Sequence, residues 1–315
     1  MTPRQIGNSP ISVPPLAFGG NVFGWTVNEA AAFPLLDAFI DASFTMIDTA
    51  DSYSRWVPGN KGGESETIIG KWLKQSGRRA KVVIATKVGS EIAPGRKGLS
   101  KKYILQSVED SLKRLQTDYI DLYQSHRDDP NTPPEETLEA YAELIKSGKV
   151  RVIGASNFTG ARIMQSLDAS KKAGIPRYEC LQPMYNLYDR EGYEKEYAGI
   201  VKEQRIGVIP YYSLAAGFLT GKYRSEKDLS QSPRGEGVKK YLNDRGFRIL
   251  AALDTVAKEH NCTPAEAALA WLMAQPGITA PIASATSLTQ LSSLMKSANL
   301  TLSSVSLHLL DEASA

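Results

Sequence analysis

The sequence has few cysteines and no long apolar run. Cys180 and Cys262 are too few for a disulfide framework, and the first segment, MTPRQIGNSP, lacks the apolar core of a signal peptide. No apolar stretch reaches the roughly 18 residues that a membrane-spanning helix needs. We therefore expect a soluble protein of the reducing cytoplasm, with no membrane partner.

Charge of one sign is not concentrated anywhere in the chain. The 315 residues include 37 Lys and Arg and 34 Asp and Glu, which gives a net charge of +3 without any basic block. Nucleic acid is therefore not expected as a partner, whereas a small anionic ligand is compatible with this composition. Hydrophobic residues make up 42% of the chain and charged residues 23%, as in ordinary globular enzymes.

Two further absences concern motifs. The segment AFGGNVFGW follows the first apolar run and does not match G-x-G-x-x-G, the usual mark of a doubly wound dinucleotide-binding sheet. The three histidines also lack the H-x-H or H-x-x-x-H spacing of metal ligands, so no metal site is expected.

What the chain does contain is a repeating pattern of short apolar runs and amphipathic stretches, as in parallel strands joined by helices. The expected strands are 15–18, 45–48, 82–87, 119–125, 150–156, 179–184, 206–212 and 279–284. Eight such units predict one (β/α)8 barrel over residues 1–315, because barrels of this size fold as a single domain. The alternative for this pattern is an open doubly wound sheet.

Local signals add detail to the barrel. Residues 4–13 are predicted to form a hairpin that plugs one end, and the tail after Leu302 is predicted to cover the outside. Ser100 is expected to cap a helix whose apolar face is formed by Ile104, Val108, Leu112 and Leu115. A second helix is expected to begin with a capping box of Thr132 and Glu135, with Pro133 at its first position.

Polar residues end or follow three of the predicted strands. Asp48 ends the second strand and Tyr53 follows it, Lys87 ends the third, and His126 follows the fourth. Taken singly, an aspartate there can be a turn cap and a tyrosine a packing residue. A lysine at the end of a buried strand is harder to dismiss, because an unpaired buried ammonium is costly. Barrel active sites lie at these strand ends, so the four side chains are expected to converge on one mouth.

Together these four groups predict carbonyl chemistry. Reduction of a carbonyl places a hydride on carbon and a proton on oxygen, and Tyr53 is the candidate proton donor. We expect Lys87 to lower the tyrosine pKa toward neutrality, Asp48 to keep Lys87 charged, and His126 to orient the carbonyl oxygen. A Schiff-base aldolase that uses Lys87 is a distinct enzyme alternative.

The sequence as a whole resembles the aldo-keto reductase superfamily. The matching segments are IDTADSY at 47–53, GGESETIIGKWL at 62–73, IATKVG at 84–89, SVEDSLKRLQTDYIDLYQSHRDDP at 107–130, GKVRVIGASNF at 148–158, LQPMYNLYDR at 181–190 and GFLTGKY at 217–223. The resemblance covers nearly the whole chain. It implies a catalytic tetrad of Asp48, Tyr53, Lys87 and His126, with Tyr53 as general acid and base.

The resemblance also implies NADP(H) as the cofactor, extended across the barrel mouth. Ser156, Asn157 and Gln182 match residues that bond the nicotinamide carboxamide, and Tyr211 matches the aromatic residue that stacks on the ring. The run Leu214 to Lys222, which includes Gly217, is expected to follow the pyrophosphate with backbone N–H groups and one ammonium. Without the resemblance, Gln182 and Lys222 could equally be an ordinary strand-end residue and a solvated charge.

Two segments depart from the family pattern. The common YSPLA is YYSLA at 211–215, so a rigid proline is missing. Near the adenosine, Ser287 and Leu294 replace frequent Arg and Asn contacts, while Thr286 and Gln290 remain. The long loop after the seventh strand, 223–246, is either a surface loop or a lid. We favour the lid and expect its Arg234 to reach a phosphate.

The substrate side is less defined. Trp25 and Trp56 follow the first two strands and either wall an apolar pocket or pack within the fold. The expected partner is a small carbonyl compound, an aldehyde or ketone, or the corresponding alcohol. Because some family members resemble β subunits of potassium channels, a cofactor-binding partner protein is the alternative from another class. The oligomeric state and the natural substrate are left open by the sequence.

Overall fold

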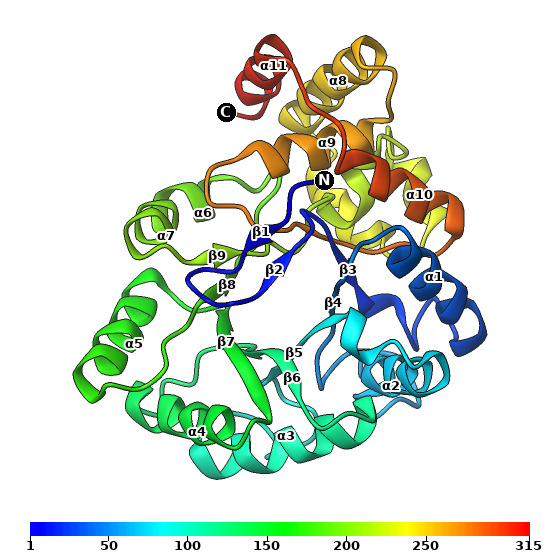
Figure 1. Cartoon of the computed structure of the whole chain (residues 1–315). Coiled ribbons are helices and arrows are strands. Elements are labelled where there is room, and N and C mark those ends of the chain that lie inside the picture. Colours follow the sequence, from blue (N-terminus) through cyan, green and yellow to red (C-terminus); the bar gives the residue numbers. More distant parts are fainter.

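A computed structural model describes residues 1–315, and its centre is a ring of eight parallel strands (Figure 1). The order around the sheet is β10-β3-β4-β5-β6-β7-β8-β9, with every pair parallel. The strands are β3 (Ala17–Gly19), β4 (Met46–Asp48), β5 (Val83–Val88), β6 (Ile120–Ser125), β7 (Val150–Ser156), β8 (Cys180–Gln182), β9 (Gly207–Val208) and β10 (Ile282–Ala283). Each lies within or overlaps one of the eight predicted runs.

The ring closes between its last two strands. The Thr279 amide donates to the Val208 carbonyl at 2.7 Å, and the Ile282 amide donates to the Pro210 carbonyl at 2.9 Å. The predicted (β/α)8 barrel is therefore confirmed, and the alternative of an open doubly wound sheet is wrong.

The N-terminal hairpin crosses one opening of the barrel (Figure 1). Its strands, β1 (Arg4–Gln5) and β2 (Ser12–Val13), pair antiparallel, as predicted. A cluster of twelve buried residues fills the interior behind it: Ile6, Ile11, Val13, Ala17, Met46, Ala85, Leu122, Val152, Cys180, Ile209, Ala280 and Ile282. The hairpin thus adds three of its own apolar side chains to the interior and closes the end at which the strands begin.

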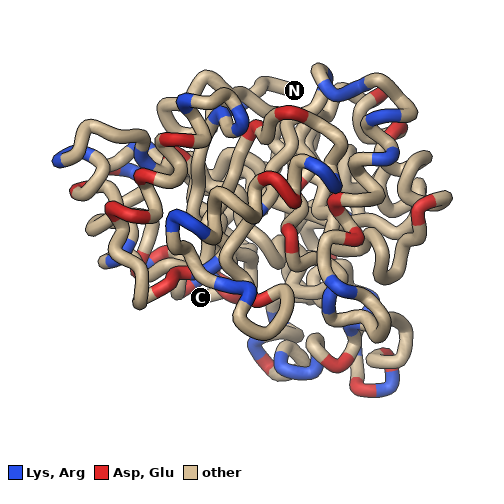
Figure 2. The backbone as a smooth tube through the Cα atoms, turned by 90° about the horizontal axis from the view of Figure 1, so that it is seen from below, with Lys and Arg blue, Asp and Glu red and all other residues tan.

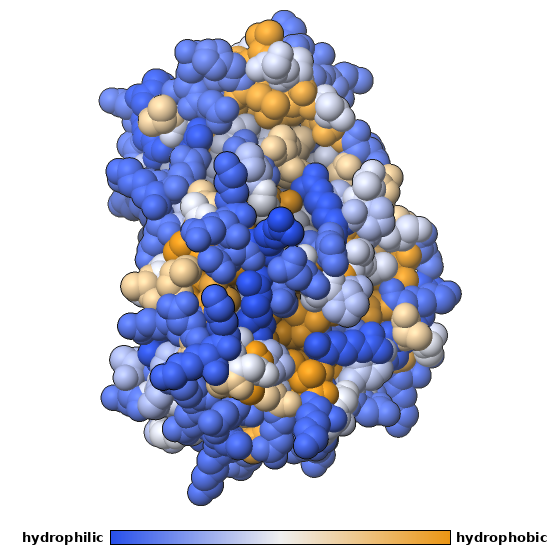
Figure 3. Space-filling view, turned by 60° about the vertical axis from the view of Figure 1, so that its left-hand side comes forward, coloured by the Kyte–Doolittle hydropathy of each residue, from blue (hydrophilic) through white to orange (hydrophobic).

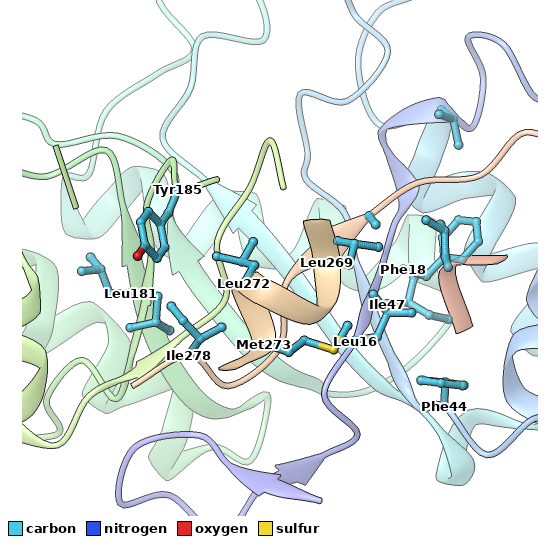
Figure 4. Close-up of a cluster of buried hydrophobic side chains, with 14 of the residues drawn as sticks. Leu16, Phe18, Phe44, Ile47, Leu181, Tyr185, Leu269, Leu272, Met273 and Ile278 are labelled. Atoms are coloured by element: carbon cyan, nitrogen blue, oxygen red, sulfur yellow. The ribbon is translucent and has the colours of Figure 1, made fainter. Parts of the chain in front are cut away.

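Helices surround the strands on the outside (Figure 1). They are α1 (Glu29–Asp41), α2 (Glu64–Ser76), α3 (Lys101–Leu115), α4 (Pro134–Lys146), α5 (Gly160–Ala173), α6 (Glu191–Glu196), α7 (Ala198–Gln204), α8 (Asp244–Glu259), α9 (Pro264–Ala274), α10 (Leu288–Ser297) and α11 (Ser304–Ser314). A second cluster of 70 buried residues lies between the strands and these helices and forms most of the core. In Figure 4, Leu269, Leu272 and Met273 of α9 lie among side chains such as Leu16 and Ile278.

The local helix signals were right at α3 and wrong at α4. The Ser100 side chain accepts a hydrogen bond from the Tyr103 amide at the start of α3, and the four predicted apolar residues of that helix are buried. Helix α4 begins one residue later than expected, with Pro133 as its N-cap and no side-chain cap. The Thr132 hydroxyl donates to Asp129 instead, at 2.7 Å, so the expected capping box does not form.

The segment between β9 and α8 contains regular secondary structure. It contains three short 3-10 helices, η3 (Ala215–Thr220), η4 (Glu226–Gln231) and η5 (Gly235–Tyr241), before α8 begins. Two further 3-10 turns are η1 (Gly20–Val22) and η2 (Arg79–Lys81). The C-terminal α11 packs against α8 and covers the outside of the barrel, as predicted (Figure 1).

The surface is mixed in charge and mostly hydrophilic. Basic and acidic residues are interspersed along the backbone in Figure 2, and the face in Figure 3 is mostly hydrophilic with several apolar patches. None of the helices combines the length and the apolar character needed to cross a membrane.

Candidate active site

The carboxyl ends of the strands carry a polar layer inside the barrel. Side chains alternate along a strand, so each residue two positions beyond the apolar interior layer again points inward. On β4, β5, β6 and β8 these residues are Asp48, Lys87, Gln124 and Gln182. All four are almost fully buried, with exposures of 1%, 0%, 0% and 2%.

Lys87 lies at the centre of this layer. Its Nζ donates to Asp48 Oδ2 at 2.7 Å, to the Thr49 carbonyl at 2.8 Å and to the Tyr53 hydroxyl at 3.0 Å. These three acceptors use all three protons of the ammonium group. The lysine at the end of β5 is thus fully hydrogen-bonded, and its charge is held against the tyrosine hydroxyl.

The electrostatics of Tyr53 differ from the sequence-based expectation. Burial raises the pKa of Tyr53 above its ordinary value, and the opposing effect of Lys87 does not overcome it. The expected net shift toward neutrality is therefore wrong for the protein alone, although the direction of the Lys87 contribution is as predicted. Burial lowers the pKa of Lys87, but Asp48 and Tyr53 more than compensate and leave it raised. At neutral pH the pair is a protonated phenol beside an ammonium ion.

His126 directly follows β6 and flanks the tyrosine. Its ring centroid is 5.9 Å from that of Tyr53, and its Nδ1 is 3.4 Å from the Ser52 hydroxyl. Burial, with smaller contributions from the Lys87 and Arg127 cations, lowers the pKa of His126 well below its usual range. The imidazole is therefore neutral at pH 7 and can offer one N–H to a polar ligand atom.

The residues expected at the nicotinamide lie together beside this layer. Asn157 Nδ2 donates to the His126 carbonyl at 2.8 Å and to Ser156 Oγ at 3.0 Å, while Asn157 Oδ1 accepts from the Tyr211 hydroxyl at 3.0 Å. Ser156 Oγ donates to the Gln182 carbonyl at 2.8 Å. Asn157 has a φ of 55°, a left-handed conformation that asparagine tolerates better than most residues. The ends of β6, β7 and β8 are thereby linked around Tyr211.

The expected pyrophosphate segment has an unusual backbone. Ala215, Ala216 and Gly217 have φ values of 49°, 57° and 99°, so three consecutive residues are left-handed. Two of their N–H groups are already used within the chain: that of Ala215 donates to the Tyr212 carbonyl at 2.7 Å, and that of Gly217 donates to the Leu214 carbonyl at 2.8 Å. Lys222 is exposed, with no ion-pair partner, and Leu214 is half-buried at the start of η3.

Arg234 and the expected adenosine residues do not form one cluster of bonded side chains. Gln290 Oε1 accepts from the Thr286 amide at 2.9 Å and from its hydroxyl at 3.1 Å, so these two residues pair with each other. The Arg234 guanidinium lies 5.2 Å above the Trp25 ring, and its Nη2 is buried without a hydrogen-bond partner. Ser287 caps α10 and Leu294 is buried in the core. The segment 223–246 thus carries an unpaired cation toward the first βα loop.

Aromatic rings connect Arg234 to the tetrad. Trp25 and Trp56 are 5.8 Å apart, and Trp56 and Tyr53 are 6.0 Å apart, both in edge-to-face geometry. Trp56 is 50% exposed, too much for a packing residue alone. The two tryptophans and Tyr53 therefore form one chain of edge-to-face rings.

Sequence reasoning missed Gln124. It lies beside Lys87 in the strand register and donates from Nε2 to Asp48 Oδ1 at 3.3 Å. A signal for it was present, because Gln124 stands two residues beyond Leu122 on a strand whose alternate residues face the interior. The Asp51 carboxyl was also missed; it is buried without a partner, and burial raises its pKa well above the usual range.

The fold and this site define a barrel with a buried Asp–Lys–Tyr chain at the carboxyl ends of its strands. The sequence profile of the Aldo/keto reductase family matches residues 15–315. The uncharacterized oxidoreductase YrpG of Bacillus subtilis (strain 168) is 34% identical over 315 residues, which cover 98% of this chain and 94% of that protein. The chain therefore belongs to the aldo-keto reductase family.

Two further relatives bear on function. The aldo-keto reductase YhdN of Bacillus subtilis (strain 168) is 36% identical over 267 residues, 83% of this chain and 76% of that protein. A probable voltage-gated potassium channel subunit beta of Arabidopsis thaliana is 32% identical over 301 residues, 93% of this chain and 90% of that protein. The family and the relatives named as oxidoreductases support the general class of oxidoreductase.

Proposed function

We propose that the protein is an NADP(H)-dependent reductase of aldehydes or ketones that also runs the reverse oxidation of alcohols. The single observation that carries this proposal is the position of Lys87 Nζ, within hydrogen-bond distance of both Asp48 and Tyr53 and fully buried. A cation held there lies against the tyrosine hydroxyl, and burial together with its charge keeps His126 neutral.

The residues present fit a nicotinamide dinucleotide. Ser156 and Asn157 offer hydroxyl and amide groups that complement a carboxamide, and Tyr211 offers an aromatic face beside them. The Gln182 NH₂ group donates to Asp48 and Gln124, so Gln182 would meet the carboxamide with its Oε1. Lys222 and Arg234 have no ion-pair partner and suit phosphates. The turn at Ala215 to Gly217 would lie along the pyrophosphate, with two of its N–H groups kept in backbone hydrogen bonds. Thr286 and Gln290 would contact the adenosine end. When bound, the nicotinamide supplies or accepts the hydride.

The protein's own groups handle the proton. In reduction, the Tyr53 hydroxyl donates its proton to the carbonyl oxygen as the carbonyl carbon gains a hydride. Lys87 stabilises the tyrosinate that results, and Asp48 holds Lys87 in the charged form. Neutral His126 donates its N–H to the same oxygen and orients it. In oxidation the tyrosinate takes the proton of the alcohol.

Trp25 and Trp56 would contact the substrate. Their rings form an apolar wall next to Tyr53, which suits a small carbonyl compound with an apolar or aromatic body. The low cysteine content favours a cytoplasmic location for this reaction.

The test is steady-state turnover by the purified protein. Aldehydes, ketones, sugars and sterols are supplied with NADPH or NADH, and the alcohol formed is compared with the cofactor consumed. We expect equal amounts of alcohol and NADP⁺ with at least one aldehyde. NADPH binding without turnover on any compound would contradict the proposal.

A second candidate comes from the relative named as a potassium channel subunit beta. A protein of that kind would bind NADPH and assemble with a channel without steady turnover. The aldolase alternative predicts that borohydride traps a carbonyl substrate on Lys87. The turnover and trapping experiments together separate the three candidates.

A further inference from the structure

Gln124 is buried beside the groups of the proposed proton transfer but has no part in that transfer. Its side chain is fully buried inside the barrel, beside Lys87 in the register of β5 and β6. Its Nε2 donates to Asp48 Oδ1 at 3.3 Å, and its Oε1 accepts from Gln182 Nε2 at 3.2 Å. Gln182 Nε2 also donates to Asp48 Oδ1, at 2.9 Å. The ionised carboxylate can only accept, so both glutamines must turn their NH₂ groups toward it.

The two oxygens of Asp48 therefore have separate tasks. Oδ2 accepts from the Lys87 ammonium at 2.7 Å, while Oδ1 accepts from the two amides. A carboxylate held at one oxygen alone can rotate about its Cβ–Cγ bond. Donors at both oxygens fix its plane and hence the place of the ammonium group that bonds it.

The barrel wall makes room for this amide. Gly154 on β7 lies between Gln124 and β8, and a Cβ added there would be 3.1 Å from Gln124 Cγ and 3.0 Å from Cys180 Cβ. Both contacts are tighter than side chains normally make. The absence of a side chain at Gly154 lets Gln124 extend across to Gln182.

An apolar residue at position 124 would avoid the free-energy cost of burying an amide. The residue two positions earlier on the same strand is Leu122, and it belongs to the apolar interior cluster. A buried amide costs free energy unless it is hydrogen-bonded, and here both of its polar atoms are used within one network. That network contains the carboxylate of the tetrad.

We propose that Gln124 is a positioning residue for the acid–base step. It fixes Asp48 and offsets part of its charge, and through Asp48 it sets how strongly Lys87 acts on Tyr53. This inference rests on the proposed function, since it needs Tyr53 as the acid. The sign follows from the charges. Asp48 raises the pKa of Tyr53 and Lys87 lowers it, so a less compensated carboxylate that draws Lys87 away will raise it further.

The test is Gln124→Met, which keeps the volume and removes both hydrogen bonds. We expect the basic limb of the kcat profile for butanal reduction to move up by about 0.5–1 pH unit, with a loss in kcat of roughly 3- to 10-fold. The KM for butanal and the Kd for NADPH should stay within about twofold, because Gln124 reaches the expected nicotinamide site only through Gln182, which keeps its own hydrogen bond to Asp48. Cys180→Ala, a change in the same part of the barrel wall outside the network, is the matched control and should leave the pH profile unmoved.

A second variant covers failure of the first to fold. Gln124→Asn keeps an amide but withdraws it from Asp48, and it should shift the limb in the same direction. A wild-type limb in a folded Gln124 variant, or a downward shift, overturns the proposal. Tyr53→Phe, measured under the same conditions, distinguishes failure of the proposed function from failure of the Gln124 inference. If Tyr53→Phe retains turnover, the proposed function fails; if it is inactive while the Gln124 variants have the wild-type profile, only this inference fails.

Discussion

The two ends of the barrel interior are built from the same strands, but one is lined by apolar residues and the other by polar, hydrogen-bonded ones. Met46, Ala85, Leu122 and Cys180 belong to the apolar layer near the hairpin. Two residues further along the same four strands stand Asp48, Lys87, Gln124 and Gln182. One step of the strand period thus separates a packed hydrocarbon layer from a hydrogen-bonded polar layer.

This difference shows how stability and chemistry are divided in the fold. The apolar end gains from burial of hydrocarbon and is closed by Ile6, Ile11 and Val13 of the hairpin. The polar end contains a buried ion pair, which is weak evidence for stability because desolvation offsets much of the attraction. If this division is correct, changes at one end should alter catalysis and changes at the other should alter folding.

The largest expected effect on catalysis is that of Tyr53→Phe. This variant removes the proton donor and leaves the ring, so kcat should fall by about 100- to 10,000-fold with the Kd for NADPH nearly unchanged. Steady-state kinetics and fluorescence titration with NADPH measure the two quantities. A variant that keeps more than half of the wild-type kcat would reject Tyr53 as the acid.

At the apolar end, Ile6→Ala should act on stability alone. Ile6 is fully buried in the hairpin, and the free energy of unfolding should fall by about 2–5 kcal/mol, against about 0.5–1.5 kcal/mol for the control Ile6→Val. Denaturant unfolding measures both losses. The kcat of the folded fraction should remain that of the wild type, and a drop in kcat would mean that the two ends are coupled.

Lys87→Met should cut kcat and change its pH dependence. The Lys87 cation lowers the Tyr53 pKa, so its removal raises that pKa and moves the basic limb of the kcat profile to higher pH. We expect a loss in kcat of about 10- to 100-fold. The double variant Asp48→Asn/Lys87→Met avoids an unpaired buried carboxylate and checks that misfolding is not the cause. A normal rate with an unshifted limb would make Lys87 a structural residue only.

The smallest expected effect concerns the lid. If Arg234 pairs with the 2′-phosphate, Arg234→Ala should weaken NADPH binding by about 5- to 10-fold and NADH binding much less. The NADPH preference should remain modest because Ser287 brings no charge. Lys227→Ala removes an exposed cation of the same segment and is the matched control. Equal losses of affinity for NADPH and NADH would show that Arg234 does not pair with the 2′-phosphate.

The sequence predicted the parts of the molecule that depend on periodicity. Eight apolar runs were enough for the barrel, and the residues at the ends of 45–48 and 82–87 were enough to bring Asp48 and Lys87 together. The hairpin at residues 4–13, an extra segment before the first strand, was also predicted, and β1 and β2 pair there. These features follow from strand direction and from alternation of side chains.

What could not be predicted depends on depth and on tertiary contacts. Burial raises the Tyr53 pKa and the Lys87 cation lowers it. Which effect is larger depends on how deeply the hydroxyl is buried, and no sequence pattern gives that depth. The Thr132 hydroxyl bonds to Asp129, a contact that the local pattern does not show, and α4 therefore begins without a side-chain cap. The contact of Arg234 with Trp25 joins residues that are far apart in the chain, across the mouth of the barrel.

The central claim is that the polar end of the barrel transfers a hydride to a carbonyl with Tyr53 as the proton donor. Its most direct test is reduction of butanal with NADPH that carries deuterium at both positions of C4 of the nicotinamide, followed by mass spectrometry of the butanol. We predict one deuterium on the carbinol carbon for each NADPH consumed, and the same labelled product from Tyr53→Phe at a rate about 100- to 10,000-fold lower. Butanol without deuterium, or an undiminished rate in Tyr53→Phe, would contradict the claim.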